Sequence, residues 1–118
     1  MDKAELSQRT RTFALRVMRL AEALPKSRPG NAIASQIVRS GTSVASNYRA
    51  CLRGRSRAEF ISKLNVVLEE ADETLLWLEL IEEGGLLKPS RISALKVEAD
   101  ELVAIFTATL KSARGNKS

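Results

Sequence analysis

The chain has 118 residues, of which 44% are hydrophobic and only 4% aromatic, and its formal net charge is +5. This length fits a single domain with an aliphatic core. Histidine is absent and Cys51 is the only cysteine, which excludes Ser-His and Cys-His nucleophile pairs, an internal disulfide and the usual kinds of zinc site. We therefore predict a non-enzymatic protein without a metal or another cofactor.

The sequence also predicts a cytoplasmic protein that does not enter a membrane. No apolar stretch reaches the roughly 18 residues that a membrane span needs, and no apolar signal core follows residues 1–5. A lone cysteine agrees with a reducing compartment.

Four segments show the apolar steps of three and four residues that mark one face of a helix. The first begins at a capping box formed by Asp2 and Glu5, and it ends before Pro25. The second begins after Asn31 as the predicted N-cap, and Gly54 ends it.

The third helix is predicted to begin at a second capping box, formed by Ser56 and Glu59, and to end at residues 84–85, which are both glycine. The fourth begins at Pro89, whose missing N–H does no harm in a first turn. Short connections favour an all-α, antiparallel, up-and-down four-helix bundle with left-handed crossings near ~20°. Residues 1–114 form the expected single domain, and residues 115–118 are expected to be a disordered tail.

Gly41 lies inside the second predicted helix. Segment 40–43 is also compatible with a loop, but the apolar periodicity continues through it and favours a helix. A helix-interior glycine costs about 1 kcal/mol relative to alanine. We therefore expect another backbone to approach closely at Gly41.

Charge divides the chain into two halves. Residues 25–63 hold eight Lys or Arg against one acid, whereas residues 64–110 hold ten Asp or Glu against three Lys or Arg. Clustered guanidinium groups suit phosphate oxygens. The candidate nucleic-acid-binding residues are Arg39, Arg49, Arg53, Arg55 and Arg57. Two other interpretations are a solvated helix end, where cations face the negative end of the helix dipole, and pairing with the acidic third helix of a neighbouring chain.

A polar stripe along the second helix predicts a structural network that fixes helix register. Its candidate members are Gln36, Arg39, Ser43, Asn47, Glu59 and Glu73. Glu73 belongs to a carboxylate run, residues 69–73, which is expected either to form a solvated face or to include an ion pair from Glu73 to Arg39. Without histidine, this run cannot complete a di-iron site of the Glu-x-x-His type. Trp77 is expected at the edge of the core or against another subunit.

The segments 36–40, 43–47 and 57–60, together with Glu73, resemble the four-helix-bundle proteins encoded in 23S rRNA intervening sequences. The resemblance covers residues from about 10 to 112. It departs at 48–51, where the family often has Ile-Ala-Glu-Gly, and at 69–70, where many members have Gly-Ser. The resemblance implies a ring-like homopentamer, and by analogy it implies binding of nucleic acid or a ribonucleoprotein through a basic surface. The alternative is a protein-interaction scaffold that binds no nucleic acid.

Overall fold

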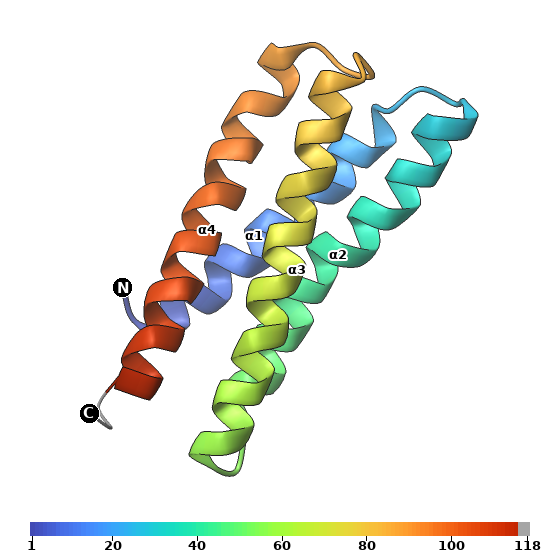
Figure 1. Cartoon of the computed structure of the whole chain (residues 1–118). Coiled ribbons are helices and arrows are strands. Elements are labelled where there is room, and N and C mark those ends of the chain that lie inside the picture. The colour runs from blue at the N-terminus through green and yellow to red at the C-terminus, as the bar shows by residue number, and fades with distance from the viewer. Residues whose placement is uncertain (116–118) are drawn as a thin grey trace.

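The computed structural model describes residues 1–115 and contains four helices, with no strand among these residues (Figure 1). The helices are α1 (Lys3–Glu22), α2 (Arg28–Leu52), α3 (Arg57–Glu83) and α4 (Pro89–Gly115). They form a rod with extents of 48 × 21 × 21 Å. The prediction of an all-α, four-helix fold is confirmed. Helix α4 includes Gly115, and the rest of the expected tail, residues 116–118, lies outside the described residues.

Consecutive helices lie side by side and are joined at alternate ends of the rod. The α1–α2 and α3–α4 connections lie at one end, and the α2–α3 turn lies at the other end with the start of α1 and the end of α4 (Figure 1). Helix α2 packs closely on α1 and on α3, and α3 packs closely on α4, whereas α1 and α4 touch more sparsely. The start of α1, the end of α2, the start of α3 and the end of α4 therefore meet at one end.

The helix starts follow the predicted capping chemistry with two corrections. Asp2 and Glu5 form the predicted capping box. Helix α2 begins earlier than expected, because the N-cap is Ser27 and not Asn31; the Ser27 hydroxyl accepts the N–H of Gly30 at 3.1 Å. Pro29 is tolerated there because the first-turn N–H groups of a helix have no intrahelical partner.

The second correction concerns the start of α3. Ser56 is the N-cap and accepts the N–H of Glu59 at 3.1 Å, as predicted. The Glu59 carboxylate, however, accepts the N–H of Arg55 at 3.0 Å instead of that of Ser56. The N–H groups of Arg55 and Ser56 both lie just before the first turn of α3, and the Glu59 carboxylate bonds to that of Arg55, which is one residue further from the helix.

Helix α3 ends at the predicted pair of glycines. Gly85 has φ +67°, in the left-handed region that favours glycine. The N–H of Leu86 donates to the carbonyl of Ile81 at 3.0 Å, and the N–H of Gly85 donates to that of Glu82 at 3.1 Å. These two bonds satisfy carbonyl groups that the end of the helix would otherwise leave unpaired.

The core is aliphatic with few aromatic rings, as the composition predicts. Phe13 and Phe106 are fully buried, and the Tyr48 ring lies 5.6 Å from that of Phe106. At Gly41 the close approach comes from a side chain and not from a backbone, which corrects the expectation. A Cβ atom at Gly41 would lie 2.7 Å from Cγ1 of Val17, which is fully buried in α1. Gly41 therefore allows α1 and α2 to pack closely.

Candidate nucleic-acid interface

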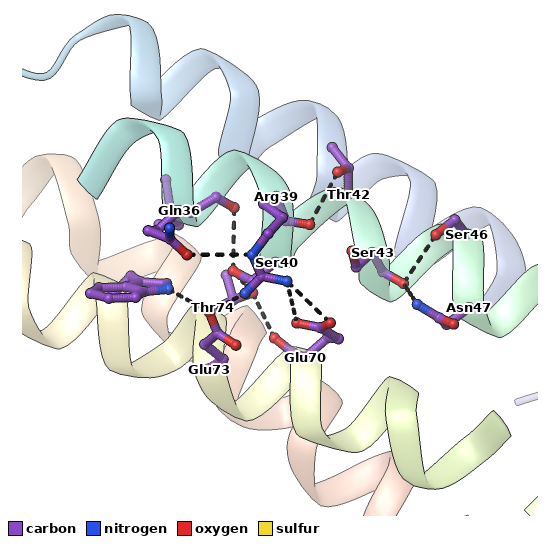
Figure 2. A network of polar contacts seen from close by, with 12 residues as sticks. Gln36, Arg39, Ser40, Thr42, Ser43, Ser46, Asn47, Glu70, Glu73 and Thr74 are labelled. Carbon is purple, nitrogen blue, oxygen red and sulfur yellow. Dashed lines mark hydrogen bonds and ion pairs between the residues drawn. The ribbon is translucent and has the colours of Figure 1, made fainter. Parts of the chain in front are cut away.

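Arg39 is held by carboxylates of its own chain. Its Nη1 lies 3.2 Å from both carboxylate oxygens of Glu70, and its Nη2 pairs with Glu73 (Figure 2). The hydrogen bond to Arg39 lowers the pKa of Glu73, and a second bond from the Trp77 Nε1–H at 3.0 Å acts in the same direction. The hydrogen bond to Glu73 in turn raises the pKa of Arg39. The ion pair expected between these residues is present, so Arg39 is engaged in a link between α2 and α3.

The other polar residues of the α2 stripe make local contacts. Gln36 Oε1 accepts from Nε of Arg39 at 3.4 Å, and Nδ2 of Asn47 donates to the carbonyl of Ser43 at 2.9 Å (Figure 2). Glu59 lies at the start of α3, where it caps the helix, and it has no contact with this stripe. The predicted set is thus divided between a cluster around Arg39, a local α2 contact and a helix cap.

A buried hydroxyl pair joins α2 to α3 beside the Arg39 cluster. Oγ1 of Thr74 lies 2.8 Å from Oγ of Ser40 and 2.7 Å from the carbonyl of Glu70, and both hydroxyl-bearing residues are fully buried (Figure 2). The helical spacing of Leu64, Val67, Ala71, Thr74 and Leu78 places Thr74 at a core position, but spacing within one helix does not reveal this bond. The available signal was a hydroxyl residue at a core position of each of two neighbouring helices.

The remaining predicted arginines gather at the end of the rod that contains the α2–α3 turn. Arg49, Arg53, Arg55 and Arg57 are all exposed. Arg57 donates from Nε to the carbonyl of Ala113 at 3.0 Å, and also from Nη2, which ties the start of α3 to the end of α4. Within residues 1–115, none of these four side chains forms an ion pair. Their charge is therefore free to meet an external anion.

Arg39 lies apart from this group. It precedes Arg53, the residue that caps the end of α2, by fourteen residues, which corresponds to about 21 Å along the helix axis at ~1.5 Å per residue. Arg39 and the terminal arginines therefore do not form one surface. Arg39 is therefore not part of the candidate interface. The terminal arginines, together with the cations that are described in the next paragraph, are called the basic end.

The fold adds cations that sequence reasoning did not group with the arginines. Nζ of Lys3 lies 5.8 Å from the centre of the Phe60 ring, which places the start of α1 beside the start of α3. Arg114 and Arg57 line an open groove of about 820 Å³, together with Ser62 and Asn65. The basic end consists of Lys3, Arg49, Arg53, Arg55, Arg57 and Arg114. Arg114 could not be found from spacing, because only the packing of α4 on α3 brings it to Arg57.

The few acids near the basic end are occupied with backbone groups. Asp2 accepts the N–H of Glu5 at 2.8 Å, and Glu5 accepts that of Asp2 at 3.0 Å. Glu59 accepts the N–H of Arg55. Because these carboxylates satisfy donors at helix starts, they do not pair with the guanidinium groups around them.

Metal-ligating side chains and the single thiol are two chemical features that can be located in the described part of the chain. Residues 1–115 contain no group of three or more metal-ligating side chains. Cys51 is buried and its Sγ–H donates to the carbonyl of Phe60 at 3.4 Å; burial raises the pKa of this thiol, which keeps it protonated and unreactive. No helix in residues 1–115 is long and apolar enough to cross a membrane.

A family model for the 23S rRNA-intervening sequence protein matches residues 2–108. The chain belongs to this family. A solved structure with a similar fold is a protein of unknown function from the S23 ribosomal protein family of Bacteroides thetaiotaomicron VPI-5482. The two share 31% identity with a TM-score of 0.86, over 94% of this chain and 99% of that chain. A search of curated proteins found no match. The resemblance seen in the sequence is thus confirmed, and neither description names a reaction.

Proposed function

We propose that this protein is a non-enzymatic, oligomeric helical bundle that binds the phosphate backbone of nucleic acid, alone or in a ribonucleoprotein, through the basic end. The observation that carries the proposal is the gathering of Arg49, Arg53, Arg55, Arg57 and Arg114 at one end of the rod, where no carboxylate of residues 1–115 forms an ion pair with them. Guanidinium groups bind phosphate oxygens in bidentate fashion.

RNA is the first ligand to test. The family is described by the intervening sequences of 23S rRNA, and the structural neighbour is described as a member of a ribosomal protein family. The basic end presents cations without a stacking platform: Phe60 is half-buried and lies under Lys3, and Tyr48 is buried in the core. Binding should therefore follow the backbone and carry little base specificity.

The proposal extends to assembly and cellular location. It includes a homopentamer, the antiparallel up-and-down order with left-handed crossings, and a cytoplasmic protein. The short connections at alternate ends of the rod support the helix order (Figure 1). The lone, buried and protonated thiol suits a reducing compartment.

The experiment measures the affinity for a short RNA by fluorescence anisotropy, between about 50 and 200 mM salt. Wild-type affinity should fall linearly on logarithmic axes as salt rises, because counterions are released from each contacted phosphate. Arg53→Ala/Arg55→Ala should weaken binding and reduce the slope by about one unit for each arginine removed. The matched control is Arg28→Ala/Arg91→Ala, which removes the same charge from exposed positions at the opposite end of the rod.

A second candidate function is a protein-interaction scaffold without nucleic acid. Helix α3 favours it, since residues 64–87 contain seven acids and no Lys or Arg, and such a surface repels phosphate. If neither RNA nor DNA binds at about 50 mM salt while the oligomer stays intact, the scaffold is correct and the basic end does not bind phosphate. Equal losses in the two double variants would show a non-specific charge effect and would also contradict the role of the basic end.

A further inference from the structure

Two exposed apolar faces of the bundle have opposite charge. Apart from Met1, the large hydrophobic side chains that are most exposed in residues 1–115 are Leu15, Met18, Leu76, Leu80 and Val97. The first two lie on α1, and the next two lie one turn apart on α3. Neither pair contributes to the core, so the packing of the single chain does not explain them.

The first face is a groove between α1 and α2, here called the α1/α2 groove. Leu15 and Met18, which are 52% and 45% exposed, line it from α1, and Ala34 and Val38 line it from α2. The groove has a volume of about 680 Å³ and continues along the same two helices into a second hollow of about 360 Å³. Its depth comes from the small side chains that α2 presents.

Cations surround the α1/α2 groove. Arg19 and Lys26 line its wider part, and Arg11 and Arg49 line the continuation; the one acid at its edge is Glu22. These four cations form no ion pair within residues 1–115. The groove is thus an apolar slot with a positive rim.

The second face is the outer side of α3, here called the α3 outer face. Leu76 and Leu80 are 46% and 38% exposed and lie four residues apart, so they form an apolar ridge on one side of the helix. Helical spacing places Glu69, Asp72 and Glu83 beside this ridge, and all three are exposed without an ion pair in the described chain. This face is an apolar ridge with a negative rim.

We propose that the α1/α2 groove of one copy receives the α3 outer face of a second copy. The leucine ridge matches the apolar slot, and the carboxylates beside it face the cations of the rim. Neither face can pair with its own kind, because groove against groove would oppose the arginines, and ridge against ridge would oppose the carboxylates. The contact is therefore heterologous, with a different face from each copy.

A heterologous contact between two copies leaves one groove and one ridge of the pair still free. Helices α1 and α3 lie diagonally across the bundle and their backbones do not pack on each other, so both faces of a copy can be occupied at once. Copies therefore add head to tail until the rotation closes a ring. This inference rests on the oligomeric part of the proposed function. Only Arg49, at the far end of the groove, belongs also to the basic end.

The test uses one substitution on each face and measures native mass by light scattering. Met18→Glu places a carboxylate in the apolar floor of the groove, opposite the carboxylates beside the ridge. Leu76→Arg places a guanidinium group on the apolar ridge, opposite the cations of the groove. Each variant should self-associate about 100-fold more weakly than the wild type and should run as a 13.0 kDa monomer. The matched control is Val97→Glu, a third exposed apolar position that belongs to neither face and should leave the oligomer unchanged.

Mixing the two variants gives the decisive result. The intact ridge of Met18→Glu fits the intact groove of Leu76→Arg, and at the next contact the new carboxylate of the first variant lies opposite the new guanidinium of the second. The mixture should therefore associate again, with the two variants alternating. A single chain with both substitutions, Met18→Glu/Leu76→Arg, places the new carboxylate of one copy opposite the new guanidinium of the next and should regain higher-order assembly. Far-UV circular dichroism checks that each variant folds; should one lose helicity, Arg19→Glu or Asp72→Arg, both at exposed charged positions, replaces it.

The outcomes separate this inference from the proposed function. If the wild type is an oligomer and both single variants keep its mass, the contact is elsewhere and the inference is wrong, while oligomerisation and RNA binding stand. If the two variants stay monomeric when mixed, the contact is not heterologous and the inference is also wrong. If the wild type is a monomer at about 100 μM, its self-association is weaker than that of a specific assembly. This result overturns both the inference and the oligomeric part of the proposed function.

Discussion

The contact between Gly41 and Val17 predicts that Gly41→Ala destabilises the protein, although alanine is the better helix former. Helix propensity alone would stabilise α2 by about 1 kcal/mol. Against this, the new Cβ would lie 2.7 Å from Cγ1 of Val17 and 3.0 Å from its Cβ and Cγ2. Val17 is fully buried and β-branched, so it has no free rotamer to which it can move. Overpacking of this kind costs roughly 1–3 kcal/mol. We expect a net loss of about 1 kcal/mol in the free energy of unfolding.

Urea unfolding, followed by circular dichroism at one fixed chain concentration, measures this loss. The control is Ser46→Ala, an exposed position on the same helix where alanine adds propensity without a clash. In Val17→Ala/Gly41→Ala the added methyl group enters the space that the valine vacates, so the double variant should be more stable than the sum of the single losses by about 1 kcal/mol. A Gly41→Ala protein as stable as the Ser46→Ala control, or more so, would refute the reasoning.

Three further predictions concern the link between α2 and α3 and the end of α3. Thr74→Val should lower the free energy of unfolding by about 1 kcal/mol, because it leaves the buried Ser40 hydroxyl with only the Ile37 carbonyl at 3.4 Å; Ser40→Ala/Thr74→Val should recover part of the loss in the same urea assay. The pKa of the Glu73 carboxylate is lower in the folded chain than in the unfolded chain, so on acidification the unfolded chain binds a proton at this carboxylate first. Wild-type stability should therefore fall as the pH drops below about 4.5 and through the folded pKa. Glu73→Gln has no such carboxylate, so its melting temperature should fall less steeply with pH in thermal melts recorded across that range. Gly85→Ala should cost about 1 kcal/mol because φ is +67°, and Gly85→Asn should cost less because asparagine tolerates this conformation; equal costs in urea would contradict this reason.

The helices could be predicted from sequence because each one carries its own periodic apolar face. Caps that depend only on residues close together in the chain, such as Asp2 with Glu5, could also be predicted from the sequence. The start of α2 was not, because Pro29 and Gly30 resemble a break when they are read locally. In the structure a Cβ at Gly30 would lie 2.0 Å from the carbonyl oxygen of Pro25. The preceding turn thus folds back on the helix, and that contact is invisible to a pattern.

The candidate site could be predicted only in part for a similar reason. The clustering of Arg49, Arg53, Arg55 and Arg57 follows from their closeness in sequence. That Arg39 is paired with Glu70 depends on the register of α3 on α2, which spacing along one helix does not determine. Arg114 joins the basic end through a contact between residues 57 and 113, which are far apart in the chain.

The places where α1 begins and α4 ends have a practical consequence. Because both lie at the same end of the rod as the α2–α3 turn (Figure 1), an affinity tag or fluorescent reporter fused before α1 or after α4 is attached near Arg53 and Arg55. A polyhistidine tag would add cationic groups of its own, and an acidic tag would occupy the arginines. Labels for binding work are therefore better attached in the α3–α4 loop, at the far tip of the rod.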